Sequence, residues 1–173
     1  MNTSLNAILD GAPAIRDEQY IAAFDDYIRS TFKICFRDVQ ARSHLFERIR
    51  PGAGFALYAT GGYGRNQGFG ADFDYIAVVH EQDGGNKKFF SKVVQKLESV
   101  ILKRGVIPHN RLSHEFNSYV IGIRELQEHL RNRGSHTFVD EAEILESRFI
   151  LGDLKLQRLF TKDIIGLVLG ENR

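Results

Sequence analysis

Two acidic residues stand at the spacing that a metal site on a β-strand requires. Asp72 and Asp74 lie two positions apart at the start of an apolar segment. In a strand, side chains at positions i and i+2 project from the same face, so both carboxylates would point at one site. Paired carboxylates suit Mg²⁺, which completes its coordination with water and substrate phosphates. We therefore expect Asp72 and Asp74 to bind Mg²⁺, in a site with one ion or two.

A glycine-rich stretch precedes these aspartates. Residues 61–70 include five glycines, among them Gly61, Gly62 and Gly64, and Arg65 lies in the same stretch. Because glycine lacks a Cβ, its backbone can approach a phosphate closely and direct N–H groups at it. If a short helix begins near Arg65, its N-terminus adds a favourable dipole for the same anion. A phosphate cradle beside two metal ligands predicts in-line displacement, in which one ion neutralises a triphosphate and a second activates the attacking oxygen.

Other phosphate-binding motifs fit the stretch less well. A dinucleotide-binding fingerprint needs a βαβ unit and a distal acid, and neither is evident here. A Walker A loop needs a Gly-Lys-Ser/Thr sequence, which does not follow the glycines. A glycine-rich turn before two aspartates is also an ordinary surface feature. The prediction of a metal and phosphate site therefore depends on the setting of this stretch, which lies between two apolar segments expected to be strands, residues 55–60 and 73–79.

The stretch at residues 59–65, followed by Asp-Phe-Asp at residues 72–74, resembles the nucleotidyltransferase domain of glutamine synthetase adenylyltransferases and of the related uridylyltransferases that modify a nitrogen-regulatory signal protein. Those families carry a Gly-Gly-x-Gly-Arg-type loop and then a Ser-Asp-x-Asp strand. The likeness covers residues 55–160, and residues 138–153 are similar to a family helix that ends in an Arg…Gly-Asp element. The resemblance implies a DNA polymerase β-like nucleotidyltransferase fold.

The resemblance also implies an activity. It implies that a nucleoside monophosphate is transferred from ATP or UTP, with Mg²⁺, to an acceptor hydroxyl on a partner protein. In that reaction Gly61, Gly62 and Gly64 would hold the triphosphate, and the two aspartates would hold the metal. Arg65 would contact phosphate, although a solvated turn residue is the alternative for that position.

One element of the family pattern is missing. The families carry a third carboxylate, in an Asp-x-Arg-Leu-Arg element, that serves the incoming nucleophile. The matching residues 109–113 have His109 in the place of the acid. Glu115 is the nearest substitute, and we expect it to be the third catalytic acid if one exists. His109 and His114 flank Arg111 and could position phosphate or act as a base.

The missing acid leaves more than one function open. The first is a nucleotidyltransferase that acts on a protein. The second is a catalytically degenerate module that binds nucleotide or a partner, because loss of the third acid can abolish transfer and leave binding intact. The third is nucleotidyl transfer to a small molecule or to RNA. The formal charge of +1 and the absence of tryptophan argue against a nucleic-acid partner.

The composition is that of one globular domain. The chain has 173 residues, of which 43% are hydrophobic, enough to form a core. The single cysteine, Cys35, excludes an internal disulfide and fits a reducing compartment. Residues 1–18 lack the basic start and apolar run of a secretory signal, and no apolar stretch approaches the roughly 20 residues that span a bilayer. We expect a cytoplasmic protein without a membrane partner.

Hydrophobic periodicity predicts an α+β fold, with a small mixed sheet, a long N-terminal helix and C-terminal helices. Three segments are expected to form one compact domain: a helical segment at 1–50, a core at 51–123 and a second helical segment at 124–173. In the core, extended segments are expected at 55–60, 73–79, 105–112 and 116–123, and a long helix at 86–104. Outside it, helices are expected at 17–49, 124–133 and 139–169, the last broken at Gly152-Asp153.

Overall fold

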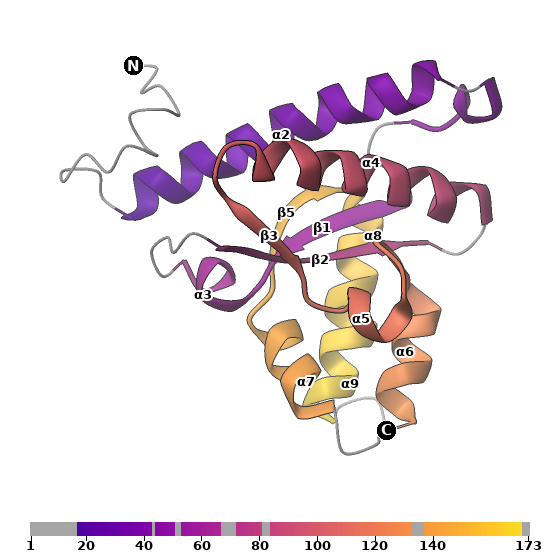
Figure 1. Ribbon diagram of the computed structural model, residues 1–173. Helices are drawn as coiled ribbons and strands as arrows, with labels where there is room; N and C mark the ends of the chain where they lie inside the picture. The colour runs from indigo at the N-terminus through magenta and orange to yellow at the C-terminus, as the bar shows by residue number, and fades with distance from the viewer. Residues whose placement is uncertain are drawn as a thin grey trace.

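The computed structural model of the chain describes residues 17–42, 44–50, 53–66, 72–80, 84–132 and 137–170 (Figure 1). For a few of these residues, His114 and Glu115 among them, only the backbone is described. Across these ranges, no helix combines the length and the apolar character needed to cross a membrane.

A mixed β-sheet forms the centre of the described structure. Its strands are β1 (Phe55–Ala59), β2 (Asp72–Val79), β3 (Ile107–Asn110), β4 (Ile121–Gly122) and β5 (Arg148–Gly152). The order is β3-β2-β1-β5, and β4 pairs with β2 beyond the end of β3. β1 runs antiparallel to both β2 and β5, whereas β2 runs parallel to β3 and β4. The predicted α+β architecture with a small mixed sheet is confirmed.

Helices cover both faces of the sheet (Figure 1). One face is covered by α2 (Asp17–Ala41), which η1 (His44–Phe46) follows, and by α4 (Gly84–Leu102). The other face is covered by α6 (Ile123–Arg131), α7 (Thr137–Leu145), α8 (Leu154–Leu159), the π-helix η2 (Phe160–Ile165) and α9 (Gly166–Leu169). The four-residue helices α3 (Gly61–Gly64) and α5 (Ser113–Phe116) lie at turns next to β1 and β3.

The alternation of β2 assigns its side chains to two separate cores. Phe73 and Tyr75 pack in the core beneath α2 and α4. Ile76 and Val78 pack in the core on the opposite face. Because neighbouring side chains on a strand point to opposite faces, Asp74 has the same orientation as Ile76 and Val78. The carboxylate of Asp74 therefore lies on the face of the sheet opposite to α2 and α4.

Stacked aromatic rings bind α2 and α4 to the sheet. Phe55 of β1 is fully buried. Its ring stacks on Phe32 at a centroid distance of 5.0 Å and on Phe90 at 4.6 Å. Such pairs add to the free energy gained by burying apolar area. Phe55 therefore links both long helices to the central strand.

Two predictions about the chain after β3 were wrong. Residues 116–123 were expected to form a strand, but α5 ends at Phe116 and the strand β4 comprises only Ile121 and Gly122. Residues 139–169 were expected to be helical up to a break at Gly152-Asp153, but α7 ends at Leu145 and β5 follows it. The helix predicted over 17–49 also ends early, at Ala41.

The strand β5 owes its position to pairing that is remote in sequence. It lies antiparallel to β1, so it completes the backbone hydrogen bonding on that side of the strand. Gly152 has φ +132°, and a Cβ there would overlap the carbonyl oxygen of Phe55. Asp153 then caps α8, because its carboxylate accepts a hydrogen bond of 2.8 Å from the N–H of Lys155. The same carboxylate accepts a second hydrogen bond, of 3.0 Å, from the N–H of Gly54 just before β1. The close approach of β5 to β1 is what excludes a continuous helix here.

We expect Phe55→Ala to lower the free energy of unfolding by about 3–5 kcal/mol, because it removes both ring stacks and leaves a cavity. Urea denaturation followed by circular dichroism measures this change. Ile34→Ala is the matched control, since Ile34 lies on α2 with 66% of its surface exposed. Equal losses for the two variants would contradict the role of the aromatic layer.

Candidate functional site

The two aspartates predicted as metal ligands lie at the N-terminal end of β2. Asp72 is exposed, and the side chain of Asp74 is 20% exposed. Both have the orientation of Ile76 and Val78, so the expected placement on one strand face is confirmed. Oδ1 of Asp74 is buried and makes no hydrogen bond with the described part of the chain. His109 and Arg111 lie within ion-pair distance of this oxygen, so a cation bound there would share the carboxylate with them.

The glycine-rich turn lies directly against Asp74. The N–H of Thr60 donates to the carbonyl oxygen of Asp74 at 3.0 Å. Gly61 follows with φ +58°, in the left-handed region, and a Cβ there would lie 2.7 Å from Oδ2 of Asp74. Only glycine meets both constraints without strain. The backbone at the start of α3 thus lies so close to the Asp74 carboxylate that no side chain fits between them.

The other residues of the turn take different positions. Gly62 is half-buried, and Gly64 is buried where a Cβ would overlap the carbonyl oxygen of Glu146. The condition that a short helix begins near Arg65 is not met, because α3 begins at Gly61 and Arg65 follows its last residue. The Arg65 guanidinium forms an ion pair with Glu146, so it is not simply a solvated turn residue.

A buried charged cluster, formed by Asp25, Tyr63 and Arg148, holds α3 in place. Asp25 of α2 is 5% exposed and accepts a hydrogen bond of 2.5 Å from the Tyr63 hydroxyl. Arg148 of β5 donates to both carboxylate oxygens of Asp25, at 2.6 and 3.1 Å. Burial, followed by the hydrogen bond to Asp25, raises the pKa of Tyr63, so this hydroxyl stays protonated as the donor. The cluster ties α3 to both α2 and β5.

None of the three residues of this cluster was predicted from the sequence to belong to the site. A signal for it was present, because Asp25 lies four positions after Ile21 and three before Ile28, on the apolar side of α2. An acid at such a position requires a buried partner. The sequence alone does not identify that partner, since Arg148 lies 123 residues away.

The strand β3 brings His109 next to the second aspartate. The parallel register pairs Asp74 with His109, and Nδ1 of His109 lies 3.3 Å from Oδ1 of Asp74. Nη1 of Arg111 lies 3.8 Å from the same oxygen. The predicted proximity of His109 and Arg111 to the aspartates is confirmed. Glu115 and His114 lie on α5, but their side chains are outside the described ones, so their roles stay predictions.

An acid from the C-terminal part of the chain completes this side of the site. Glu143 of α7 is 7% exposed, and its Oε1 accepts hydrogen bonds from Nε and Nη2 of Arg111, at 2.9 and 2.6 Å. These bonds to Glu143 raise the pKa of Arg111. The second oxygen, Oε2, is buried without a hydrogen bond to the described residues. Sequence reasoning assigned no role to Glu143.

Two observations fit a divalent cation at the start of β2. Asp74 has a buried oxygen without a hydrogen bond, and the backbone at Gly61 closes one side of the same carboxylate. In the described parts of the chain, no three His, Cys, Asp or Glu side chains gather as a ready-made metal site. A cation held by Asp72 and Asp74 would therefore take its other ligands from water and substrate, as Mg²⁺ commonly does.

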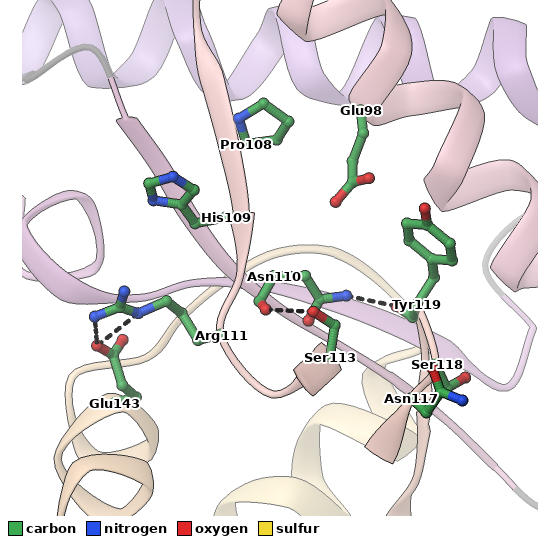
Figure 2. A pocket seen from close by; sticks show the side chains of 10 residues that line it. All are labelled: Glu98, Pro108, His109, Asn110, Arg111, Ser113, Asn117, Ser118, Tyr119 and Glu143. Atoms are coloured by element: carbon green, nitrogen blue, oxygen red, sulfur yellow. Dashed lines mark hydrogen bonds and ion pairs between the residues drawn. The ribbon is translucent and has the colours of Figure 1, made fainter. Parts of the chain in front are cut away.

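A pocket of about 760 Å³ opens beside β3 (Figure 2). Figure 2 shows His109, Arg111 and Glu143 on one side of the strand, and Glu98 and Tyr119 on the other. Because His109 and Arg111 also contact Asp74, the pocket adjoins the acidic end of β2. The structure thus places the glycine turn at Gly61, the acidic end of β2 and a polar pocket side by side.

A polar pair lies at the far wall of this pocket. The Tyr75 hydroxyl donates to Oε1 of Glu98 at 2.5 Å. Burial raises the pKa of Glu98, although the hydrogen bond from Tyr75 opposes this change. Burial also raises the pKa of Tyr75 well above its ordinary value, so its hydroxyl is a donor at neutral pH. Glu98 is therefore an acid whose charged form is disfavoured by its position.

Comparison with known proteins adds no relative. No protein-family model matches the chain, and no curated protein matches it. The similarity to adenylyltransferases consequently stays a resemblance of motif residues.

The raised pKa of Glu98 predicts a pH dependence of stability. In the pH range above the ordinary pKa of a glutamate, the folded state binds more protons at this position than the unfolded state, so stability falls as pH rises through the folded pKa. Glu98→Gln keeps an oxygen for Tyr75 and removes the buried charge. We expect this variant to be more stable than the wild type at neutral pH, with a difference that shrinks toward mildly acidic pH.

Urea denaturation at both pH values measures this difference. Glu128→Gln is the matched control, because Glu128 is exposed on α6 outside the pocket. A stability difference that grows on acidification would show that the charged form of Glu98 stabilises the fold.

Proposed function

We propose that this protein transfers a nucleoside monophosphate from Mg²⁺-bound ATP or UTP to an acceptor hydroxyl. The observation that carries this proposal is the packing of Gly61 against Asp74. A left-handed glycine without room for a Cβ puts bare backbone next to a carboxylate whose Oδ1 makes no hydrogen bond with the described residues, although His109 and Arg111 lie within ion-pair distance of it. Polyphosphate needs both parts, because backbone N–H groups bind its oxygens and a metal ion neutralises its charge.

The order of the strands also supports the proposal. An antiparallel pair, β1 and β2, is joined by the glycine turn, and β3 adds in parallel on the far side of β2. We propose that this arrangement is the DNA polymerase β-like nucleotidyltransferase fold that the motif residues imply. In that fold Asp72 and Asp74 would lie between the triphosphate and the acceptor.

The residues of this chain would act mainly by alignment and by charge. Bound Mg²⁺ would supply positive charge to the triphosphate. Asp72 and Asp74 would hold that ion, and Gly61 and Gly62 would orient the phosphates through their backbone. The ion pair of Arg65 with Glu146 keeps a guanidinium beside the turn, where it would meet a bound phosphate. Arg65 has 40% of its side chain exposed, which leaves it accessible for that contact.

A second function, nucleotide binding without transfer, is favoured by His109. Its ring lies 3.3 Å from Asp74, in the position where the adenylyltransferases are expected to carry a third acid. An imidazole accepts a proton but binds Mg²⁺ less readily than a carboxylate does. Binding and transfer must therefore be measured separately.

We expect the double variant Asp72→Asn, Asp74→Asn to lose Mg²⁺-dependent binding of ATP and UTP, because amides neutralise the metal ligands without changing their size. Calorimetric titration of the wild type and the variant measures this loss. A second assay uses ATP and UTP labelled on the α-phosphate, with a cell lysate as the source of acceptors. Label in a lysate component supports transfer, whereas binding without labelled product supports the second function. Equal triphosphate affinity in the double variant would refute the metal site.

Gly61→Ala and Gly105→Ala form a matched pair. Both glycines have positive φ, +58° and +81°, so each substitution should cost about 1–2 kcal/mol of stability. At Gly105 a Cβ would meet no atom within 4 Å, whereas at Gly61 it would displace the Asp74 carboxylate. We therefore expect similar losses of stability but loss of Mg²⁺-triphosphate binding only in Gly61→Ala. Binding that survives in Gly61→Ala would refute the role given to this contact.

A further inference from the structure

The pocket beside β3 lies on the opposite side of the aspartates from the glycine turn. In the sheet, β2 lies between β1 and β3. The turn that begins at Gly61 follows β1, whereas His109 and Arg111 of the pocket wall extend from β3 toward Asp74. In-line phosphoryl transfer places the attacking and leaving oxygens on opposite sides of the phosphorus. If pyrophosphate leaves over the glycine turn, the attacking hydroxyl comes from the pocket.

Two buried acceptors in the lining of this pocket have no hydrogen-bond donor among the described residues. Asn110 and Glu143 are 8% and 7% exposed, and each has a buried oxygen that makes no hydrogen bond with the described residues, Oδ1 and Oε2 respectively. A buried acceptor without a donor costs free energy. The Glu98 carboxylate adds further acceptor capacity. A ligand that satisfies these atoms must itself carry several hydrogen-bond donors.

The size of the pocket and the ring of Tyr119 favour a small ligand with C–H and hydroxyl groups. A volume of about 760 Å³ lies within the range of roughly 300–1,000 Å³ typical of small-molecule sites. Tyr119 lines the pocket on the same side of β3 as Glu98, and its side chain supplies an aromatic ring and a hydroxyl (Figure 2). A ring face can pack on the C–H groups of a sugar or cyclic polyol, and its hydroxyl can bond to theirs.

We infer that this pocket binds a small polyhydroxylated molecule, such as a sugar or a cyclic polyol, and that one of its hydroxyls accepts the nucleotidyl group. The inference rests on the proposed function and gives that function its acceptor. It differs from the protein acceptor that the resemblance implies, because the lining supplies acceptors to a ligand rich in donors.

The reaction balances with these components alone. The acceptor hydroxyl oxygen forms a bond to the α-phosphorus of the triphosphate, and its proton passes to solvent. The bond between the α-phosphorus and the oxygen that bridges to the β-phosphorus breaks, and pyrophosphate leaves with the bonding electrons. The products are a nucleoside monophosphate ester of the polyol and pyrophosphate.

The test supplies the full chain with Mg²⁺, α-labelled ATP or UTP, and one of three probes: D-glucose, D-ribose or myo-inositol. A tyrosine-containing peptide serves as the protein-like acceptor. Chromatography and mass spectrometry detect the labelled ester. We expect at least one polyol to gain a nucleoside monophosphate and the peptide to stay unlabelled.

Two pocket variants locate the acceptor. Tyr119→Phe removes only a hydroxyl, and Glu98→Gln removes the charge and replaces one acceptor oxygen with an amide NH₂ donor. We expect each to raise the KM for the polyol by about tenfold, the effect of one lost hydrogen bond, and to leave the affinity for Mg²⁺-triphosphate unchanged. Glu128→Gln, exposed and outside the pocket, should change neither quantity.

Each other result overturns a different claim. Triphosphate binding with label in the peptide or in lysate proteins, but in none of the polyols, refutes the acceptor class and leaves the proposed function standing. Labelled polyol with an unchanged KM in both pocket variants refutes the pocket as its site. Triphosphate binding without any labelled product refutes transfer itself, and absence of triphosphate binding refutes the proposed function together with this inference.

Discussion

The candidate site depends on the close approach of the backbone at Gly61 to the side chain of Asp74. The hydrogen bond from the Thr60 N–H to the Asp74 carbonyl oxygen sets this approach, and the left-handed conformation of Gly61 follows from it. Any side chain at Gly61 would push the carboxylate away, so the geometry of the acid and that of the turn cannot vary independently. A phosphate held by the turn would lie next to the acid for the same reason.

Three arginine–carboxylate pairs connect this arrangement to the C-terminal part of the chain. Arg148 binds Asp25, Arg65 binds Glu146, and Arg111 binds Glu143. Each arginine or its partner lies in α7, in β5 or between them. Arg148–Asp25 is the most buried of the three pairs and Arg65–Glu146 the most exposed. A buried pair adds little net stability, but removal of one partner leaves an uncompensated charge. Their main effect is therefore to fix where α3 and β3 lie relative to the C-terminal segment.

Local pattern was enough to predict part of the fold and of the site. The apolar run of β2 and the spacing of Asp72 and Asp74 correctly placed both acids on one face of a strand, because alternation needs no tertiary information. His109 was expected near the site from its place in the motif, and the parallel register of β2 and β3 pairs it with Asp74. The strand β5 was missed, because its conformation depends on pairing with β1 across nearly 100 residues of chain. The role of Glu143 was missed because it depends on contact with Arg111, which lies 32 residues away in the sequence.

The relation between Glu143 and Arg111 determines how available Asp74 is to a cation. Arg111 lies 3.8 Å from Oδ1 of Asp74, a distance at which a free guanidinium would compete with a metal ion. Glu143 holds the same guanidinium through hydrogen bonds of 2.6 Å from Nη2 and 2.9 Å from Nε, which offset its charge and leave Nη1 as the nitrogen that faces Asp74. Oδ1 consequently keeps no hydrogen bond in the described structure. Glu143 thus reduces the competition of Arg111 for Asp74. The C-terminal segment therefore affects how Asp74 binds a cation, in addition to supporting the site.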